Sequence, residues 1–299
     1  MSNDVLKIKM LMGDYPNTHA LRSGKISSPR LSIDFDPETT VNLRFKPLVR
    51  EQAYDIGELA IATFLQAKAF GKPLILIPAV MRGKLAHSAM TYNATLGDMK
   101  PKDLEGKRAG VRAWAQTTPL WVRGILENDY GVDMSKVKWT TFEDSHCAEY
   151  PDPAGMVRAP AGKKLRQMLL DGELDAATVS EQRDAPDSKL KTLIPDAKAA
   201  GEAWYQKYKV IPINHMLCVK ESVLKEHPWA VEEVFRLVGE SKKAAGLPPA
   251  NAPDQFPLGV EANRKALAMA IKYSYQQKLI PREFTVDELF SDFTRALGK

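Results

Sequence analysis

The sequence predicts an α/β protein with two lobes, because three features of its 299 residues agree on that class. Short apolar strands alternate with helical stretches along most of the chain, which is typical of largely parallel sheets. Residues 95–105 and 208–219 indicate two crossings between lobes, and the C-terminal part indicates a helical tail. We therefore expect lobe 1 to comprise residues 1–98 and 214–299 and lobe 2 to comprise residues 99–213. A ligand would bind in the hinged cleft between them.

The composition is that of a globular protein, and it argues against several functional classes. The chain is 44% hydrophobic and 26% charged, and its net charge is +5. Lys and Arg are scattered among acids, so nucleic-acid binding is not indicated, and no apolar run approaches the length of a membrane span. The N-terminus lacks the pattern of a signal peptide, so we expect a cytoplasmic protein.

The clearest local pattern is a predicted strand that ends at Val111 and leads through a polar loop into a helix. Thr117 or Thr118 is a natural N-cap, and Pro119 suits the first helical turn. Such a loop directs backbone N–H groups and the positive end of the helix dipole at an anion, and a carboxylate is the expected anion in a small-molecule site. Arg112 would add a charge-assisted bond. The alternative is an ordinary strand–helix joint.

Other polar residues follow predicted strands. Asp14 and Thr18 follow the first strand, where α/β proteins place ligand contacts, and turn capping is the alternative for both. Glu181 takes the corresponding position after a strand of the second lobe. His87 follows a buried strand, although a lone histidine is more often structural than catalytic.

The sequence predicts neither a metal site nor an organic cofactor. His146, Cys147 and Glu149 are close in sequence, but no second cluster lies at metal-ligand spacing. The second cysteine, Cys218, is far from the first, which argues against a disulfide scaffold. No glycine-rich nucleotide-binding loop is present. A bound divalent metal is the alternative.

Several motifs together resemble the 4,5-dihydroxyphthalate decarboxylase family, and the resemblance extends through nearly the whole chain. It implies a type II periplasmic-binding-protein-like fold and the activity of a cytoplasmic decarboxylase. Two arginines of the family pattern are replaced by Asn17 and Ala86. Because arginine holds a planar carboxylate with two parallel bonds, a different aromatic acid is an alternative to a phthalate. The matching segments are Gly13-Asp14-Tyr15 with Thr18, residues 54–59 (YDIGEL), Ile77-Pro78, His87-Ser88, residues 103–111 (DLEGKRAGV), Thr117, residues 121–126 (WVRGIL), 130–132 (YGV), 212–215 (PINH), 227–229 (HPW), 276–282 (QQKLIPR) and 288–290 (ELF).

The resemblance implies non-oxidative loss of CO2 from a hydroxylated aromatic acid, phthalate-like or hydroxybenzoate-like. That reaction needs an acid to protonate the ring carbon and an environment drier than water. His87 and His215 are the candidate proton donors, because imidazole titrates near neutral pH. Glu58 or Asp14 would accept a phenolic proton or orient a histidine. The candidates for holding the substrate are Thr18, Arg112, Thr117, Thr118, Arg123 and Glu181. For Arg123, an ordinary surface or salt-bridge role is the alternative.

A solute-binding protein or sensor for an aromatic carboxylate is the alternative function, since the fold does not decide between binding and catalysis. The absence of a signal peptide and the presence of two histidines with an acid at strand ends favour an enzyme. The expected partner is a small aromatic acid, with neither nucleic acid nor membrane. The helical tail would pack on a second copy as readily as on its own lobe, so a homo-oligomer stays open.

Overall fold

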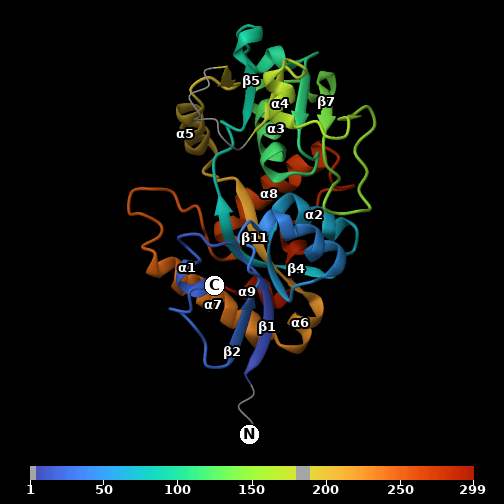
Figure 1. Ribbon diagram of the computed structural model, residues 1–299. Helices are drawn as coiled ribbons and strands as arrows, with labels where there is room; N and C mark the ends of the chain where they lie inside the picture. Colours follow the sequence, from blue (N-terminus) through green and yellow to red (C-terminus); the bar gives the residue numbers. More distant parts are fainter. Residues whose placement is uncertain (1–4, 180–188) are drawn as a thin grey trace. The chain divides into compact units, whose positions relative to one another are not determined.

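A computed structural model describes residues 5–179 and 189–299 and divides the chain into two compact units, each with its own sheet (Figure 1). Unit 1 is formed by Met1–Lys84, Ile211–Tyr275 and Ile280–Lys299, and unit 2 by Leu85–Val210 and Gln276–Leu279.

This division differs from the predicted one in its boundaries. Residues 85–98, assigned to lobe 1 from the sequence, belong to unit 2. The reason is β5 (Met90–Asn93), which pairs antiparallel with β9 (Ala176–Thr178) and β10 (Leu190–Thr192) in the second sheet. These partners follow more than 80 residues later, so local sequence did not reveal them.

The sheet of unit 1 has the strand order β2-β1-β3-β11-β4. The parallel strands β1 (Leu6–Leu11), β2 (Leu31–Phe35) and β3 (Ile56–Ala60) form one side. Since β1 lies between β2 and β3, the chain changes direction along the sheet there. Open α/β sheets bind ligands at the carboxyl ends of strands that flank such a point.

The other side of this sheet is antiparallel. β11 (Ile213–Lys220) pairs with β3 and with β4 (Leu74–Gly83), and its register with β4 is irregular on both sides of His215. β4 continues through Pro78. An edge strand tolerates proline because the missing N–H need not serve a neighbouring strand.

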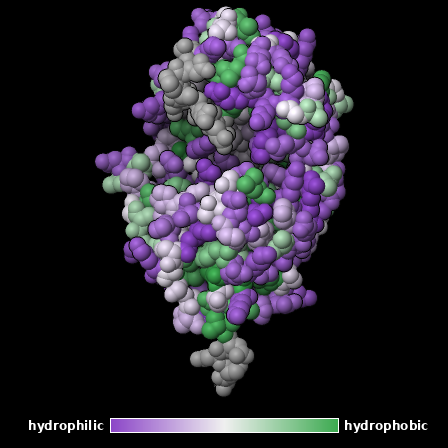
Figure 2. Space-filling model, viewed as in Figure 1, coloured by the Kyte–Doolittle hydropathy of each residue, from purple (hydrophilic) through white to green (hydrophobic). Residues whose placement is uncertain are grey.

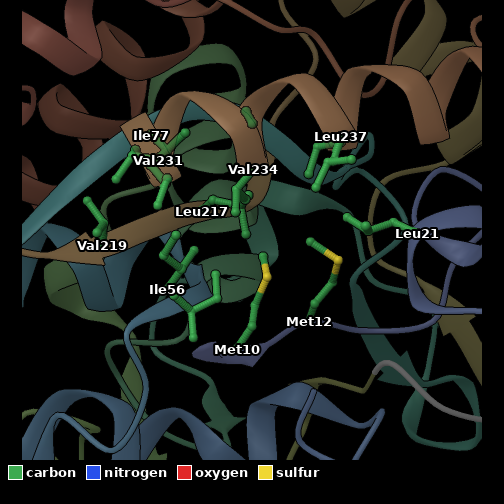
Figure 3. Close-up of a cluster of buried hydrophobic side chains, with 14 of the residues drawn as sticks. Met10, Met12, Leu21, Ile56, Ile77, Leu217, Val219, Val231, Val234 and Leu237 are labelled. Carbon is green, nitrogen blue, oxygen red and sulfur yellow. The ribbon is translucent and has the colours of Figure 1, made fainter. Parts of the chain in front are cut away.

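One long helix, α7 (Pro228–Ala244), covers the sheet of unit 1 and builds its core (Figure 3). Val231, Val234 and Leu237 recur at helical spacing, point toward the strands and are fully buried. They pack in one cluster with Met10, Ile56 and Leu217 from β1, β3 and β11. Each fully buried Val or Leu side chain contributes about 1.5–3 kcal/mol, so this face fixes the strands that carry the candidate site.

The remaining elements of unit 1 are short or belong to the tail. The predicted helical tail is present, and it ends in a 3-10 turn followed by a five-residue helix. The elements are α1 (His19–Arg22), η1 (Val41–Arg44), η2 (Pro47–Glu51), α2 (Ile61–Ala69), α6 (Glu221–Glu226), α8 (Val260–Gln276, whose last residue belongs to unit 2), η6 (Asp287–Leu289) and α9 (Asp292–Ala296).

Unit 2 has a sheet in the order β10-β5-β9-β6-β7-β8. The predicted strand–loop–helix motif is confirmed as β6 (Arg108–Val111) followed by α3 (Thr117–Tyr130), which ends at Gly131 in the left-handed conformation. The other elements are η3 (Ala94–Leu96), η4 (Pro101–Leu104), η5 (Met134–Lys136), β7 (Lys138–Thr141), β8 (Val157–Arg158), α4 (Leu165–Leu170) and α5 (Ala197–Tyr208).

The N-cap predicted for α3 is wrong by one or two positions. Gln116 is the N-cap, because it stays extended and its carbonyl accepts the first helical bond from Leu120 N at 2.9 Å. Thr117 and Thr118 are therefore the first two helical residues, and no side chain caps the helix.

The surface is mostly hydrophilic in the view of Figure 2, where hydrophobic residues appear in small groups. Within the described ranges, no helix combines the length and the apolar character that crossing a membrane requires.

Candidate active site

A buried acid–histidine pair lies in the sheet of unit 1. Glu58 is the third residue of β3 and is 0% exposed, and His215 on β11 is 7% exposed. The Nδ1 atom of His215 lies 2.6 Å from Oε1 of Glu58. His215 pairs with Ala60 in the ladder, and because side chains alternate along a strand, Glu58 and Ala60 share one face. The pair is thus a diagonal contact fixed by the register of two central strands.

The carboxylate of Glu58 has two further donors from the loop that follows β1. The backbone N–H of Gly13 donates to Oε2 at 2.9 Å, and the hydroxyl of Tyr15 donates to Oε1 at 3.0 Å. An ionised carboxylate is an acceptor at both oxygens, so three donors at these positions fit the ionised form of Glu58. With Glu58 accepting, the Nδ1 atom of His215 carries a hydrogen and its Nε2 atom faces away from the acid.

Tyr15 is held in its neutral form. Burial raises the pKa of Tyr15 well above its ordinary value, and the negative charge of Glu58 raises it further, whereas the positive charge of Arg82 opposes the rise. The guanidinium carbon of Arg82 lies 5.1 Å from the centre of the Tyr15 ring. At neutral pH the Tyr15 hydroxyl therefore acts as a hydrogen-bond donor to Glu58.

The loop from Gly13 to Thr18 fixes the position of Tyr15. The Thr18 hydroxyl donates to the carbonyl of Gly13 at 2.7 Å and accepts from the backbone N–H of Tyr15 at 2.9 Å. A β-carbon at Gly13 would lie 2.1 Å from Cζ of Tyr15, so the Tyr15 ring can take this position only because residue 13 is glycine. These hydrogen bonds of Thr18 are those of turn capping, the alternative that the sequence left open for it.

An aromatic side chain borders the histidine. The ring of Phe45 meets the ring of His215 edge-on, with centroids 5.2 Å apart and planes at 82°. Phe45 is 1% exposed, so it limits access of water on that side of the imidazole.

Two of the four predicted catalytic residues, Asp14 and His87, have other contacts. Asp14 is exposed and pairs with Nδ1 of His19 at 3.0 Å. His87 belongs to unit 2, is 1% exposed and meets the ring of Trp204 edge-on at 5.6 Å. Burial lowers the pKa of His87, although the charge of Asp129 opposes this, and its Nδ1 atom has no partner among the described residues. A histidine in this state favours the neutral form, which is a poor proton donor.

Most predicted substrate-binding residues lie in unit 2. Arg112 forms an ion pair with Glu143 at 3.2 Å and is partly exposed. Thr117 and Thr118 begin α3, so their backbone N–H groups are at the positive end of a 14-residue helix, as the anion-binding hypothesis requires. Glu181 lies outside the described residues.

Arg123 is neither a surface residue nor part of a salt bridge with a described acid. It is 0% exposed; its Nε donates to Oε1 of Gln277 at 2.7 Å and its Nη2 to the carbonyl of Trp114 at 2.7 Å. The guanidinium carbon stacks 3.6 Å from the centre of the Trp114 ring. Burial lowers the pKa of Arg123 to about 9, with the nearby Tyr150 opposing, so the group keeps its charge at neutral pH.

Replacing Arg123 with lysine is expected to lower the free energy of unfolding by about 1–3 kcal/mol, because one ammonium cannot reproduce two divergent bonds and a stacked plane. Chemical denaturation measures this change. Arg112→Lys is the matched control, and its partly exposed ion pair predicts a change within about 0.5 kcal/mol. Equal stability of the two variants would show that the Arg123 contacts contribute little.

The described ranges contain no group of three or more His, Cys, Asp or Glu side chains placed to hold a metal ion. Three residues of the Glu58 network, Tyr15, Arg82 and Phe45, were not among the predicted site residues. Tyr15 belongs to the Gly13-Asp14-Tyr15 motif, and that motif is the sequence feature from which its role could have been predicted. Nothing in the sequence pointed to Phe45, whose contact spans 170 positions.

Comparison with curated proteins confirms the sequence resemblance. The chain is 29% identical over 251 residues to 4,5-dihydroxyphthalate decarboxylase of Comamonas testosteroni, covering 80% of this chain and 76% of that protein. It is 27% identical over 215 residues to the protein of the same name from Pseudomonas putida, covering 67% and 82%. Both names denote decarboxylases, which supports the predicted enzyme class. No protein-family model matches the chain.

Comparison with solved structures confirms the periplasmic-binding-protein-like fold. The alkanesulfonate-binding protein SsuA from Xanthomonas axonopodis pv. citri matches with a TM-score of 0.60 at 15% identity, over 95% of this chain and 98% of that one. The aliphatic sulphonate-binding protein SsuA from Escherichia coli matches with a TM-score of 0.61 at 11% identity, over 96% and 98%. The desulfurization enzyme DSZB matches with a TM-score of 0.56 at 12% identity, over 96% and 97%. This fold therefore serves both binding proteins and an enzyme, and it does not decide the function.

Proposed function

We propose that this chain, a relative of the curated 4,5-dihydroxyphthalate decarboxylases, is a carboxy-lyase that removes CO2 from a hydroxylated aromatic acid. The observation that carries the proposal is the buried bond of 2.6 Å between Glu58 and His215. A buried carboxylate that orients an imidazole is an arrangement for proton transfer, and pure ligand binding has no need of it.

His215 is the proposed proton donor. In its protonated form, Nδ1–H donates to Glu58 and Nε2–H is left for the substrate. The proton passes from Nε2 to the ring carbon that bears the carboxylate. The bond between that carbon and the carboxylate then breaks, and its electron pair returns to the ring. CO2 leaves, and a proton from water restores His215.

The surroundings of His215 support this chemistry. Glu58 stabilises the positive imidazole, while Gly13 and Tyr15 hold the carboxylate in place through its other lone pairs. The edge of Phe45 keeps water from one side of the ring. Loss of CO2 spreads the charge of the departing carboxylate, so a less polar pocket favours the reaction.

The substrate is proposed as a phthalate-like or hydroxybenzoate-like acid. The two positions that carry arginine in the family pattern provide no cation here. Asn17 is 1% exposed, and its side-chain amide donates to the carbonyl of Met81 at 3.3 Å. Ala86 is 3% exposed. A cation that holds a second carboxylate must therefore come from another position.

Incubation with a panel of hydroxyphthalates and hydroxybenzoates is expected to release one CO2 per substrate consumed, with the ring product lacking one carboxylate. Chromatography of the products and CO2 trapping measure this. Tight binding across the panel without CO2 release would support a solute-binding protein or sensor in place of the enzyme.

A further inference from the structure

Arg82 is a cation of the Glu58 network that the proposed proton transfer does not use. It lies on β4 between two buried neighbours, Met81 and Gly83, but its own side chain is exposed. It is the ladder partner of His215, and the register of β4 and β11 is irregular on both sides of that pair. Such irregularities redirect side chains and are frequent next to active sites.

The guanidinium of Arg82 lies over the Tyr15 ring, and the Tyr15 hydroxyl donates to Glu58. Within residues 5–179 and 189–299, no carboxylate forms an ion pair with Arg82. Two other arginines near the ends of β1 and β2 are differently placed. Arg22 donates to the carbonyls of Met12 and Asp36, and Arg44 pairs with the carboxylate of Asp36 at 3.4 Å. Arg82 is thus an exposed cation next to Tyr15, and no described acid forms an ion pair with it.

We propose that Arg82 binds a second carboxylate of the substrate, the one that stays on the ring. It would supply the positive charge that the arginines of the family pattern, replaced here by Asn17 and Ala86, do not supply. This inference rests on the proposed function. It narrows the substrate from a phthalate-like or hydroxybenzoate-like acid to an aromatic acid with two carboxylates. The departing carboxylate is the less suitable ligand, because a cation that holds its charge in place would oppose the loss of CO2. A retained carboxylate keeps its charge throughout, so a two-bond contact with arginine fixes the ring without that penalty.

The test uses two probes that separate binding of the retained carboxylate from turnover. Removal of one carboxylate from 4,5-dihydroxyphthalate gives 3,4-dihydroxybenzoate, which keeps the retained group, whereas 1,2-dihydroxybenzene has neither carboxylate. Calorimetric titration of the intact protein is expected to show that Arg82→Gln weakens binding of 3,4-dihydroxybenzoate by about tenfold to hundredfold. Binding of 1,2-dihydroxybenzene should stay unchanged, and Arg82→Lys should recover part of the loss.

Arg30→Gln is the matched control, since it also removes one arginine charge. Arg30 immediately precedes β2, and its guanidinium carbon lies 4.2 Å from the centre of the Trp229 ring. The control variant should leave both affinities unchanged, and thermal unfolding should confirm that each variant folds. Equal affinity of wild type and Arg82→Gln for 3,4-dihydroxybenzoate would overturn the proposal, as would a loss of the same size for 1,2-dihydroxybenzene. Because these are binding measurements, they also hold if no substrate is turned over. Absence of turnover with the wild type would overturn the proposed function, and the Arg82 result would then describe a carboxylate receptor.

Discussion

His215→Gln is expected to lower kcat for decarboxylation by at least about 100-fold and to change KM little, because a positioned acid contributes about 10²–10⁴ to the rate. Glutamine fills a similar volume and can still donate a hydrogen bond to Glu58, so the buried carboxylate keeps a partner. It cannot give a proton to the ring carbon. Steady-state kinetics with the best substrate of the panel measure both constants.

His227→Gln is the matched control, because it changes a histidine at the start of α7 that has no side-chain cap bond, and it should leave kcat unchanged. His87→Gln in the same assay decides between the two histidines that the sequence singled out. A loss of 100-fold in His87→Gln with normal turnover of His215→Gln would remove His215 from the mechanism and assign the proton transfer to the second unit.

The sequence predicted the fold class because strands, helices and their turns are local. The strand that ends at Val111 and the helix after it follow from the local pattern of apolar and polar residues. The unit boundary did not follow, because β5 belongs to the second sheet only through strands 80 or more residues away. Pairing between strands far apart in sequence depends on the whole fold, so a short stretch of sequence does not predict it.

The candidate site shows the same limit. Glu58 and His215 were both singled out, but their 2.6 Å contact joins residues 157 positions apart. The sequence left Arg123 as a substrate-binding candidate or as an ordinary surface or salt-bridge residue. It is buried because Trp114 stacks on it and Gln277, 154 positions later, accepts its hydrogen bond. A polar side chain can be interpreted only when its partners are known.

Glu58→Gln is expected to lower kcat by about 10²–10⁴-fold, because the groups around this side chain are all donors when the site is active. Its amide must direct an NH2 group at one of them. If that group faces the N–H of Gly13, two donors oppose each other in a buried place. If it faces His215, Nδ1 must become an acceptor and the imidazole is held neutral. Either arrangement removes the stabilised imidazolium, and steady-state kinetics measure the resulting fall in kcat.

Combining the two substitutions tests whether Glu58 and His215 act as one unit. If the acid works only by orienting and stabilising the histidine, the double variant should be little slower than the slower single variant, as for other catalytic groups that depend on each other. Tyr15→Phe provides a graded comparison, since it removes one donor of Glu58 and leaves the contact with His215, and a smaller loss is expected. If the fold reduction in kcat of the double variant equals the product of the two single reductions, and circular dichroism shows intact folding, Glu58 acts on the substrate directly and not through His215.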